Sequence, residues 1–299
     1  MYSDNVRLGN ITTMRVGGSA NVVRPDSVTA LIETVNRLKD RGKNFFVLGA
    51  GSNVVAQDEP LEDMVIVTRN MTGITFDGVR ITCDSGVSLP GLARLAADRG
   101  LSGLEWAVGI PATVGGAIVG NAGAHGGDMG SVVRSVTVFE NGQVRRYSKT
   151  QCRFGYRDSI FGSGGTIVLS AELELSVGDG GDIRLAMHKL IQKRLSNQPT
   201  EPSAGSVFKS VGDTPAWIYI DKAGLRGLRV GGAMVSPKHA NFIVNTGGAT
   251  ACDIVELTGT ITDRVRAAAN VTLRPEIKLL GYIGDKAYDT WRLPYAYRF

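Results

Sequence analysis

The feature that most constrains this chain is a glycine-rich run at residues 109–127, which holds seven glycines and no Asp, Glu, Lys or Arg. Such a segment bends tightly and brings backbone N–H groups close to a partner, yet it has no charge of its own. Two interpretations follow: an N–H cradle for a pyrophosphate, or a glycine-rich turn at the surface or in a barrel. A second glycine segment, residues 47–54, directly follows an apolar run and favours the cradle.

The composition is that of a folded globular chain, with 43% hydrophobic and 20% charged residues among 299. The length allows two or three compact domains. A net charge of +5 favours anionic partners. Because consecutive Lys and Arg residues form only short pairs and no longer run, a phosphorylated small molecule explains this charge better than nucleic acid does. The three cysteines are far apart and predict neither a disulfide framework nor a metal site.

The sequence shows no targeting or membrane segment. Its first residues contain no apolar signal region, and no apolar span approaches the roughly 18 residues that cross a bilayer. We therefore expect a cytoplasmic protein without a membrane partner.

Hydrophobic periodicity predicts an α/β arrangement in the first third of the chain. A helix begins after Asp26 or Ser27 and ends near Gly42, and a strand follows at residues 45–48. The glycine segment after that strand does not complete Gly-x-Gly-x-x-Gly, and no helical period continues beyond it. A Rossmann-type dinucleotide fold is therefore disfavoured.

The middle of the chain is predicted to be rich in strands. We expect a helix at residues 88–99, and strands at residues 64–68, 79–83, 132–140 and 167–177. A glycine break at 178–181 then precedes a helix that Asp182 opens and that ends at residues 198–199. We place a domain boundary at this break.

The last third is predicted to be an α+β domain of about 100 residues. A helix begins at Thr214 and Pro215, strands are expected at residues 228–235 and 241–245, and Thr250 caps a further helix. The predicted domains are residues 1–180, with subdomains of about 1–64 and 65–180, and residues 181–299, which include a C-terminal tail.

Three residues outside the glycine loops are candidates for chemistry. Arg157 lies among aromatic residues, where it can clamp a carboxylate or form a surface pair with Asp158. Ser206 follows a glycine but is not in a nucleophile elbow, so by itself it is a turn serine. Glu276 lies between a proline and an apolar run, so it points inward at a strand edge or forms a surface salt bridge.

His125 lies within the glycine loop, where it can touch a ligand or be joined to it covalently, or where it faces solvent or bonds to the backbone. The other histidines, His188 and His239, are too far apart in sequence for their spacing to support a metal site.

Taken in order, these segments closely resemble the UDP-N-acetylenolpyruvoylglucosamine reductase family, and they cover nearly the whole chain. Any one motif is weak, but their succession is specific. The matching segments are residues 10–18, 47–54, 109–127, 156–159, 202–209, 223–225, 239–245 and 274–276.

The resemblance implies an α+β fold: an FAD-binding domain of the vanillyl-alcohol-oxidase (PCMH) type in two subdomains, followed by an α+β substrate-binding domain. The length fits the compact subgroup without an extra tyrosine-bearing loop. The family uses non-covalent FAD to pass a hydride from NADPH to the enolpyruvyl carbon of UDP-N-acetylglucosamine enolpyruvate. We expect no nucleic acid partner, no membrane and no second subunit.

By the same resemblance, Arg157 stabilises the charge that develops on the substrate, Glu276 completes the polar network, and Ser206 delivers a proton. Arg15 is a lesser candidate for FAD binding. The residues expected at FAD are Val47, Leu48, Gly49, Ala50, Gly51, Ser52, Asn53, Ser85, Gly86, Gly109, Ile110, Pro111, Thr113, Val114, Gly115, Gly116, Asn121, Ala122, Gly123, His125 and Gly126.

The chain departs from the common family pattern in places. Ser210 and Val211 stand where the family often has Asn-Pro, Met234 where it often has Gln, and His125 where it commonly has Tyr. At residues 210–211 and 234 we expect substrate contacts to differ from the common pattern, and with His125 in place of Tyr we still expect FAD to be non-covalent. Two other functions also remain open: a flavin oxidase of the same fold, and a non-catalytic binder of nucleotide sugars.

Overall fold

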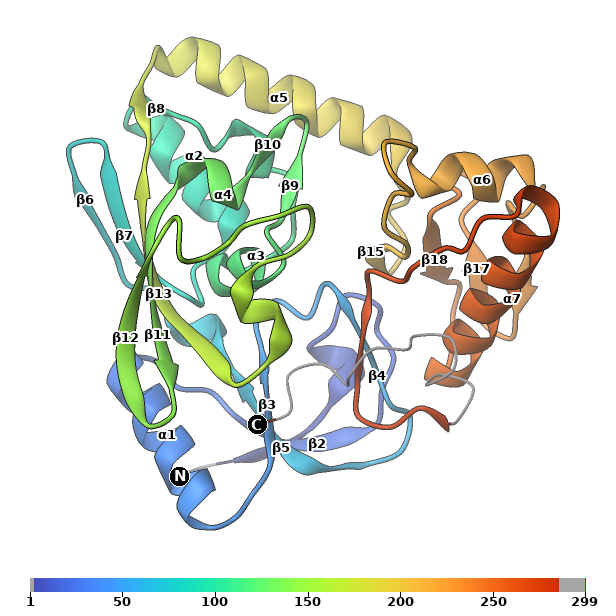
Figure 1. Ribbon diagram of the computed structural model, residues 1–299, viewed down its shortest axis with the longest axis horizontal. Coiled ribbons are helices and arrows are strands. Elements are labelled where there is room, and N and C mark those ends of the chain that lie inside the picture. The colour runs from blue at the N-terminus through green and yellow to red at the C-terminus, as the bar shows by residue number, and fades with distance from the viewer. Residues whose placement is uncertain (1–2, 285–298) are drawn as a thin grey trace.

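The computed structural model describes residues 3–284 and 299 (Figure 1). The first unit is a four-stranded sheet in the order β1-β2-β5-β3, in which β2, β5 and β3 are parallel and β1 is antiparallel to β2. Short 3-10 turns, η1 (Leu8–Asn10) and η2 (Thr68–Asn70), adjoin it. The strands are β1 (Asp4–Arg7), β2 (Ser19–Val23), β3 (Phe45–Leu48) and β5 (Leu61–Val67).

The predicted first helix is confirmed as α1 (Val28–Asp40). Ser27, and not Asp26, caps it by accepting a hydrogen bond of 3.2 Å from the backbone N–H of Ala30. Its apolar stripe buries Leu31, Val35 and Leu38.

The second unit is an antiparallel five-stranded sheet in the order β12-β11-β13-β7-β6. The predicted strand at 167–177 is interrupted at Leu175, so that its end forms the separate β14 (Ser176–Val177), paired with β8 (Leu101–Ser102). The sheet strands are β6 (Ile74–Asp77), β7 (Arg80–Asp84), β11 (Val133–Glu140), β12 (Gln143–Ser148) and β13 (Thr166–Glu174).

Helices α2 (Leu89–Asp98), α3 (Val114–Val119) and α4 (Met129–Val132) share one hydrophobic core with this sheet. The hairpin of β9 (Gly123–Ala124) and β10 (Gly127–Asp128) lies within the glycine-rich run, and η3 (Glu105–Ala107) and η4 (Ile160–Ser163) complete the unit.

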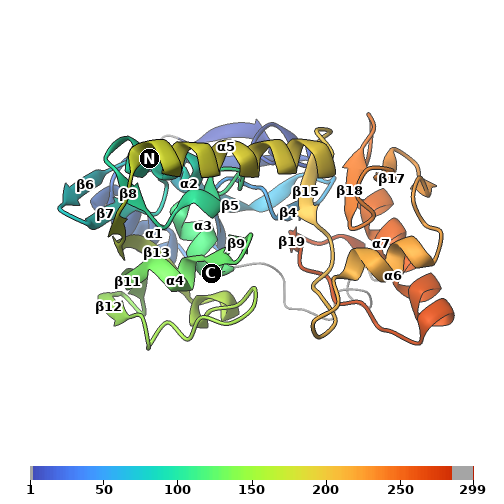
Figure 2. The same ribbon diagram turned by 90° about the horizontal axis from the view of Figure 1, so that it is seen from above.

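The helix that we assigned to the second domain packs instead with the first. It is α5 (Gly180–Asn197), and its buried residues Ile183 and Met187 belong to the core of the five-stranded unit. Its cap is Asp179, which accepts from the N–H groups of Gly181 and Asp182, so the helix opens earlier than expected. The helix spans the molecule from the second unit to the third (Figures 1 and 2).

The third unit has an antiparallel sheet in the order β15-β18-β17-β16, with α6 (Ala216–Lys222) and α7 (Ala251–Ala269). The predicted strand at 228–235 is two short strands joined by a turn at Gly231 and Gly232. The capping box of Thr250 and Asp253 is confirmed at the start of α7. The strands are β15 (Ser203–Ser206), β16 (Arg229–Val230), β17 (Ala233–Val235) and β18 (Phe242–Asn245).

The end of the described chain returns to the first unit. β19 (Lys278–Leu280) pairs in parallel with β4 (Val54–Ala56), which directly follows the first glycine loop. This pairing places residues 274–276 between the first and third units. Residues 285–298, in the region of the predicted C-terminal tail, lie outside the described residues. No helix in the described part is long and apolar enough to span a bilayer.

Candidate active site

The two glycine segments, far apart in sequence, lie against each other. A Cβ atom on Gly49 would overlap Oγ1 of Thr113. Thr113 is also the cap of α3, where its hydroxyl accepts from the N–H of Gly116 at 3.3 Å. Glycine is therefore needed at position 49 for the first and second units to approach each other here.

The first loop fits an anion cradle. The N–H groups of residues 50–53 donate to no described residue. The carbonyls behind them are held by protein: those of Gly49 and Ala50 by Arg69, and that of Gly51 by the N–H of Thr13 at 3.0 Å. The free donors suit the oxygens of a pyrophosphate.

The second loop is more closely packed on the protein than a simple cradle would be. The N–H groups of Val114 and Gly115 donate to the carbonyls of Val87 and Ser85, each at 2.8 Å. A Cβ on Gly115 would lie 2.7 Å from the Cβ of Ser85. Close backbone packing therefore explains the glycine at position 115.

Ser85 is nevertheless a candidate residue for binding the cofactor. Its side chain is only 2% exposed, and its hydroxyl has no hydrogen-bond partner among the described residues. A buried hydroxyl without a partner is costly, and a bound cofactor would relieve that cost.

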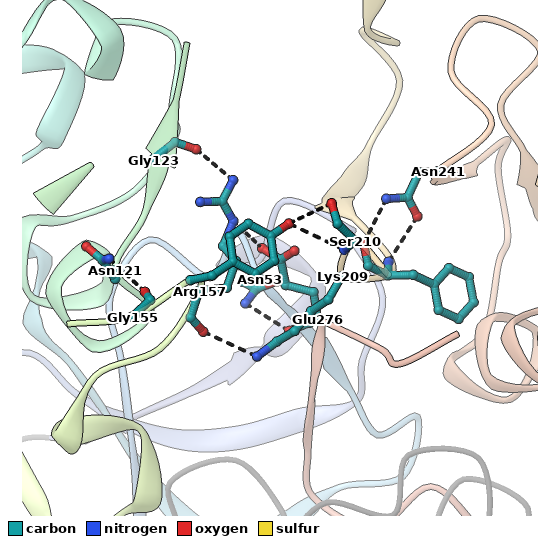
Figure 3. A network of polar contacts seen from close by, with 11 residues as sticks. Asn53, Asn121, Gly123, Gly155, Arg157, Lys209, Ser210, Asn241 and Glu276 are labelled. Atoms are coloured by element: carbon teal, nitrogen blue, oxygen red, sulfur yellow. Dashed lines mark hydrogen bonds and ion pairs between the residues drawn. The ribbon is translucent and has the colours of Figure 1, made fainter. Parts of the chain in front are cut away.

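Asn121 supports the site from within the protein. Its backbone is left-handed (φ 39°), and its side chain is 2% exposed. The amide donates to the carbonyl of Gly155 at 2.8 Å (Figure 3). It also donates to Asp128 at 3.1 Å, and its oxygen accepts from the N–H of Gly130 at 2.9 Å. The bond to Gly155 joins the glycine loop to the loop that carries Arg157, and the other two hold the glycine loop against the start of α4.

Arg157 and Glu276 form an ion pair across the molecule, with 3.1 Å between Nε and Oε1 (Figure 3). The guanidinium also donates to the carbonyl of Gly123 at 2.7 Å. Arg157 itself has a left-handed backbone (φ 53°). Among the described residues its carboxylate partner is therefore Glu276, and not its neighbour Asp158.

Burial raises the pKa of Glu276, against the opposing effect of Arg157 and Lys209. Its backbone is fixed on both sides: its N–H donates to the carbonyl of Val207 at 2.7 Å, and its carbonyl accepts from the side chain of Asn53 at 3.2 Å. Glu276 thus points inward, as one of the two interpretations of the sequence required.

Ser206 ends β15 and lies one residue before Val207, the backbone partner of Glu276. The side chain of Asn241 makes two hydrogen bonds to Phe208, the residue after Val207. It accepts from the N–H of Phe208 at 3.0 Å and donates to the carbonyl of Phe208 at 2.8 Å (Figure 3). The structure therefore brings the Ser206 and Glu276 segments together, and Asn241 is a support that sequence reasoning missed.

Further contacts join the Arg157 loop to the third unit. The hydroxyl of Tyr156 lies 3.0 Å from Oγ of Ser210, and Nζ of Lys209 donates to the carbonyl of Arg157 at 3.4 Å. Burial, with repulsion from Lys209, lowers the pKa of Lys278 to about 8. These lysines and Arg157 make the site cationic, which suits a carboxylate or phosphate.

His125 is exposed and has a left-handed backbone (φ 54°). Desolvation lowers its pKa, and so do the charges of Lys193 and Arg194 at the end of α5.

The described residues contain no cluster that could hold a metal ion. The other expected cofactor residues lie along the same two loops or beside Ser85: Val47, Leu48, Ser52, Gly86, Gly109, Ile110, Pro111, Ala122 and Gly126.

Two family models match the chain. Residues 19–148 match an FAD binding domain, and residues 198–280 match the C-terminal domain of UDP-N-acetylenolpyruvoylglucosamine reductase. The reductase of that name from Carboxydothermus hydrogenoformans is 40% identical, and the match covers 93% of each chain. That from Synechococcus sp. (strain RCC307) is 42% identical, with 93% of each chain covered.

The chain belongs to the UDP-N-acetylenolpyruvoylglucosamine reductase family. A crystal structure of the reductase from Thermus caldophilus superposes with a TM-score of 0.82 at 36% identity, covering 94% of this chain and 100% of that one. The expected fold class and the FAD cofactor are thereby confirmed. The C-terminal family model begins at residue 198, directly after α5.

Proposed function

We propose that this chain catalyses the NADPH-dependent reduction of UDP-N-acetylglucosamine enolpyruvate to UDP-N-acetylmuramate, in peptidoglycan precursor synthesis. The observation that carries the proposal is the Arg157–Glu276 pair, set between the two glycine loops and the third unit in a chain of this reductase family. When bound, FAD supplies a route for the hydride from NADPH to the enolpyruvyl carbon distal to the carboxylate.

In this proposal Arg157 stabilises the negative charge that hydride addition leaves on the carboxylate side of the substrate. Its guanidinium is already oriented by Glu276 and by the carbonyl of Gly123. A preorganised donor is most effective where charge develops in the reaction. Lys209 and Lys278 add positive charge around the same place.

Ser206 would deliver the proton to the carbon next to the carboxylate. A serine hydroxyl is a weak acid, so this step needs the strongly basic carbon that hydride addition creates. The paired backbones of Val207 and Glu276 keep Ser206 close to the Arg157 pair. Glu276 therefore acts mainly by orienting Arg157.

For the cofactor, we propose that the N–H groups of residues 50–53 hold the pyrophosphate and that the hydroxyl of Ser85 is a further partner, with FAD bound non-covalently. The free donors and the unpartnered hydroxyl support this assignment.

The packing of α5 supports a boundary near residue 198, and the end of β5 supports a division of the FAD-binding domain near residue 68.

We also propose that the enzyme acts as a monomer in the cytoplasm. One chain supplies the cradle, the Arg157 pair and Ser206, so no second copy is needed to complete the site. The cytoplasm is where a nucleotide-sugar precursor and NADPH meet.

The test is anaerobic mixing with NADPH while flavin absorbance is recorded, followed by the enolpyruvyl sugar nucleotide. NADPH should bleach the flavin, and the substrate should restore its colour. Bleaching by an alcohol or hydroxy acid without a response to NADPH would indicate a flavin oxidase. Purified protein that releases no flavin on denaturation would indicate a non-catalytic binder.

A further inference from the structure

Arg69, in the turn η2 after β5, binds backbone carbonyls of the first glycine loop. Its Nε donates to the carbonyl of Gly49 at 3.1 Å, and its Nη2 donates to the carbonyls of Ala50 and, at 2.7 Å, Ile11. A planar guanidinium can hold several carbonyls at once because its donors lie in a fixed fork.

These hydrogen bonds determine the direction in which the N–H groups of the loop point. In a trans peptide the C=O and the following N–H lie on opposite sides, and the described chain has no cis bonds. Holding the carbonyls of Gly49 and Ala50 toward Arg69 therefore turns the N–H groups of Ala50 and Gly51 the other way. The carbonyl of Gly51, bound by Thr13, does the same for the N–H of Ser52.

The loop also packs closely against the backbone of Ile11. A Cβ on Gly51 would lie 2.5 Å from the Ile11 carbonyl, and Gly51 has a left-handed backbone (φ 64°). The same Nη2 of Arg69 donates to the carbonyls of Ile11 and Ala50. It therefore links the two backbone segments that meet at Gly51. Desolvation and repulsion from Arg24 lower the pKa of Arg69, which is the cost of placing its charge here.

We propose that Arg69 is a positioning residue for the FAD pyrophosphate: by holding the carbonyls of residues 49 and 50, it fixes the N–H donors on the opposite face of the loop. Arg69 acts through the loop and does not itself contact the cofactor. The proposal rests on FAD being the cofactor, and not on which substrate is reduced.

The experiment uses the full-length holoenzyme and the variants Arg69→Lys and Arg69→Gln, with Arg24→Gln as the control. Arg24 lies close enough to repel Arg69, but it pairs with Asp4 on the surface and touches no loop carbonyl. The rate of FAD release after dilution is followed by recovery of flavin fluorescence. The temperature at which that fluorescence appears gives a second reading.

Both Arg69 variants should release FAD about 10- to 100-fold faster, because several hydrogen bonds to a charged group are lost. Arg24→Gln should match the wild type. Lysine keeps the charge but not the fork, so a wild-type release rate in Arg69→Lys would show that charge alone suffices and would overturn the proposal. If Arg69→Gln does not fold, Arg69→Lys still decides.

A matched measurement separates this proposal from the proposed function. With FAD in large excess, the Arg69 variants should recover the wild-type rate of bleaching by the reductant. Failure to recover with the site saturated would place Arg69 in the chemistry and contradict a positioning role. If wild-type flavin does not respond to NADPH, the reductase proposal fails while the release rates still test Arg69.

Discussion

Nε of Arg157 lies 3.1 Å from Oε1 of Glu276, although the two residues are far apart in the sequence. Arg157 is on the loop after β12, and Glu276 precedes β19, which pairs with β4 of the first unit. The pair therefore depends on how the segment before β19 packs between the first unit and the Arg157 loop. Its formation ties the orientation of Arg157, which we propose stabilises charge on the substrate, to the pairing of β19 with β4.

Replacing Arg157 should make stability depend on pH. Burial already raises the pKa of Glu276, and Arg157→Gln removes the opposing charge, so that pKa rises further. The folded state then binds more protons than the unfolded state above the ordinary glutamate pKa of about 4.3, and stability falls as pH rises through this window. We expect a loss of about 1–3 kcal/mol at neutral to alkaline pH and a smaller loss near pH 5.

The measurement is urea unfolding of both proteins across this pH range. Arg153→Gln, on the same loop and exposed, is the matched control and should show no such slope. An Arg157→Gln loss that is equal at all pH values would mean that Glu276 is not its energetic partner.

Ser206→Ala should separate the two halves of the reaction. Flavin reduction by NADPH should stay near the wild-type rate, while reoxidation by the enolpyruvyl substrate should slow by roughly 100-fold or more, as for loss of a positioned proton donor. Stopped-flow absorbance under anaerobic conditions measures both rates. Ser203→Ala, at the other end of β15, is the control and should leave both unchanged. Equal slowing of both steps by Ser206→Ala would argue against the proton-donor role.

Asn121 allows its side-chain bonds and its backbone conformation to be tested separately. Asn121→Gly keeps the left-handed backbone but loses the bonds to Gly155, Asp128 and Gly130, and we expect a loss of about 2–3 kcal/mol. Asn121→Ala should lose about 1 kcal/mol more, because alanine is strained at a positive φ. Unfolding curves in urea give both values. An alanine variant as stable as the glycine variant would contradict the strain.

The parts of the fold that the sequence predicted depend on local chemistry. Ser27 and Thr250 cap helices through bonds within one turn, and the glycine segments are visible because glycine is unusual. The apolar stripe of α5 was also visible, but not which sheet it covers, and this misplaced the helix between domains.

The candidate site was predictable only in its residue types. Arg157, Ser206 and Glu276 were singled out by residue type and surroundings, and their roles came from the resemblance. The pairing of Arg157 with Glu276 depends on how β19 docks on β4. Arg69 and Asn241 were missed because each acts on backbone groups that become neighbours only in the folded chain. A buried asparagine and a turn arginine carry no local signal of such a role.

Asn241 gives the last prediction. Asn241→Ala leaves the N–H and carbonyl of Phe208 without their side-chain partner in a buried place, and should cost about 2–3 kcal/mol. Asn241→Asp keeps an acceptor for the N–H, but when ionised it repels the carbonyl. Protonation restores a donor in the position of the amide, and burial raises the pKa of such a carboxyl.

The aspartate variant should therefore regain stability as pH falls, since its folded state binds the extra proton, while the alanine variant should lose a constant amount relative to the wild type. Urea unfolding at neutral pH and near pH 5 distinguishes the two. Parallel pH profiles for both variants would show that the bond from Asn241 to the Phe208 carbonyl is not what holds the strand that carries Ser206 beside Glu276.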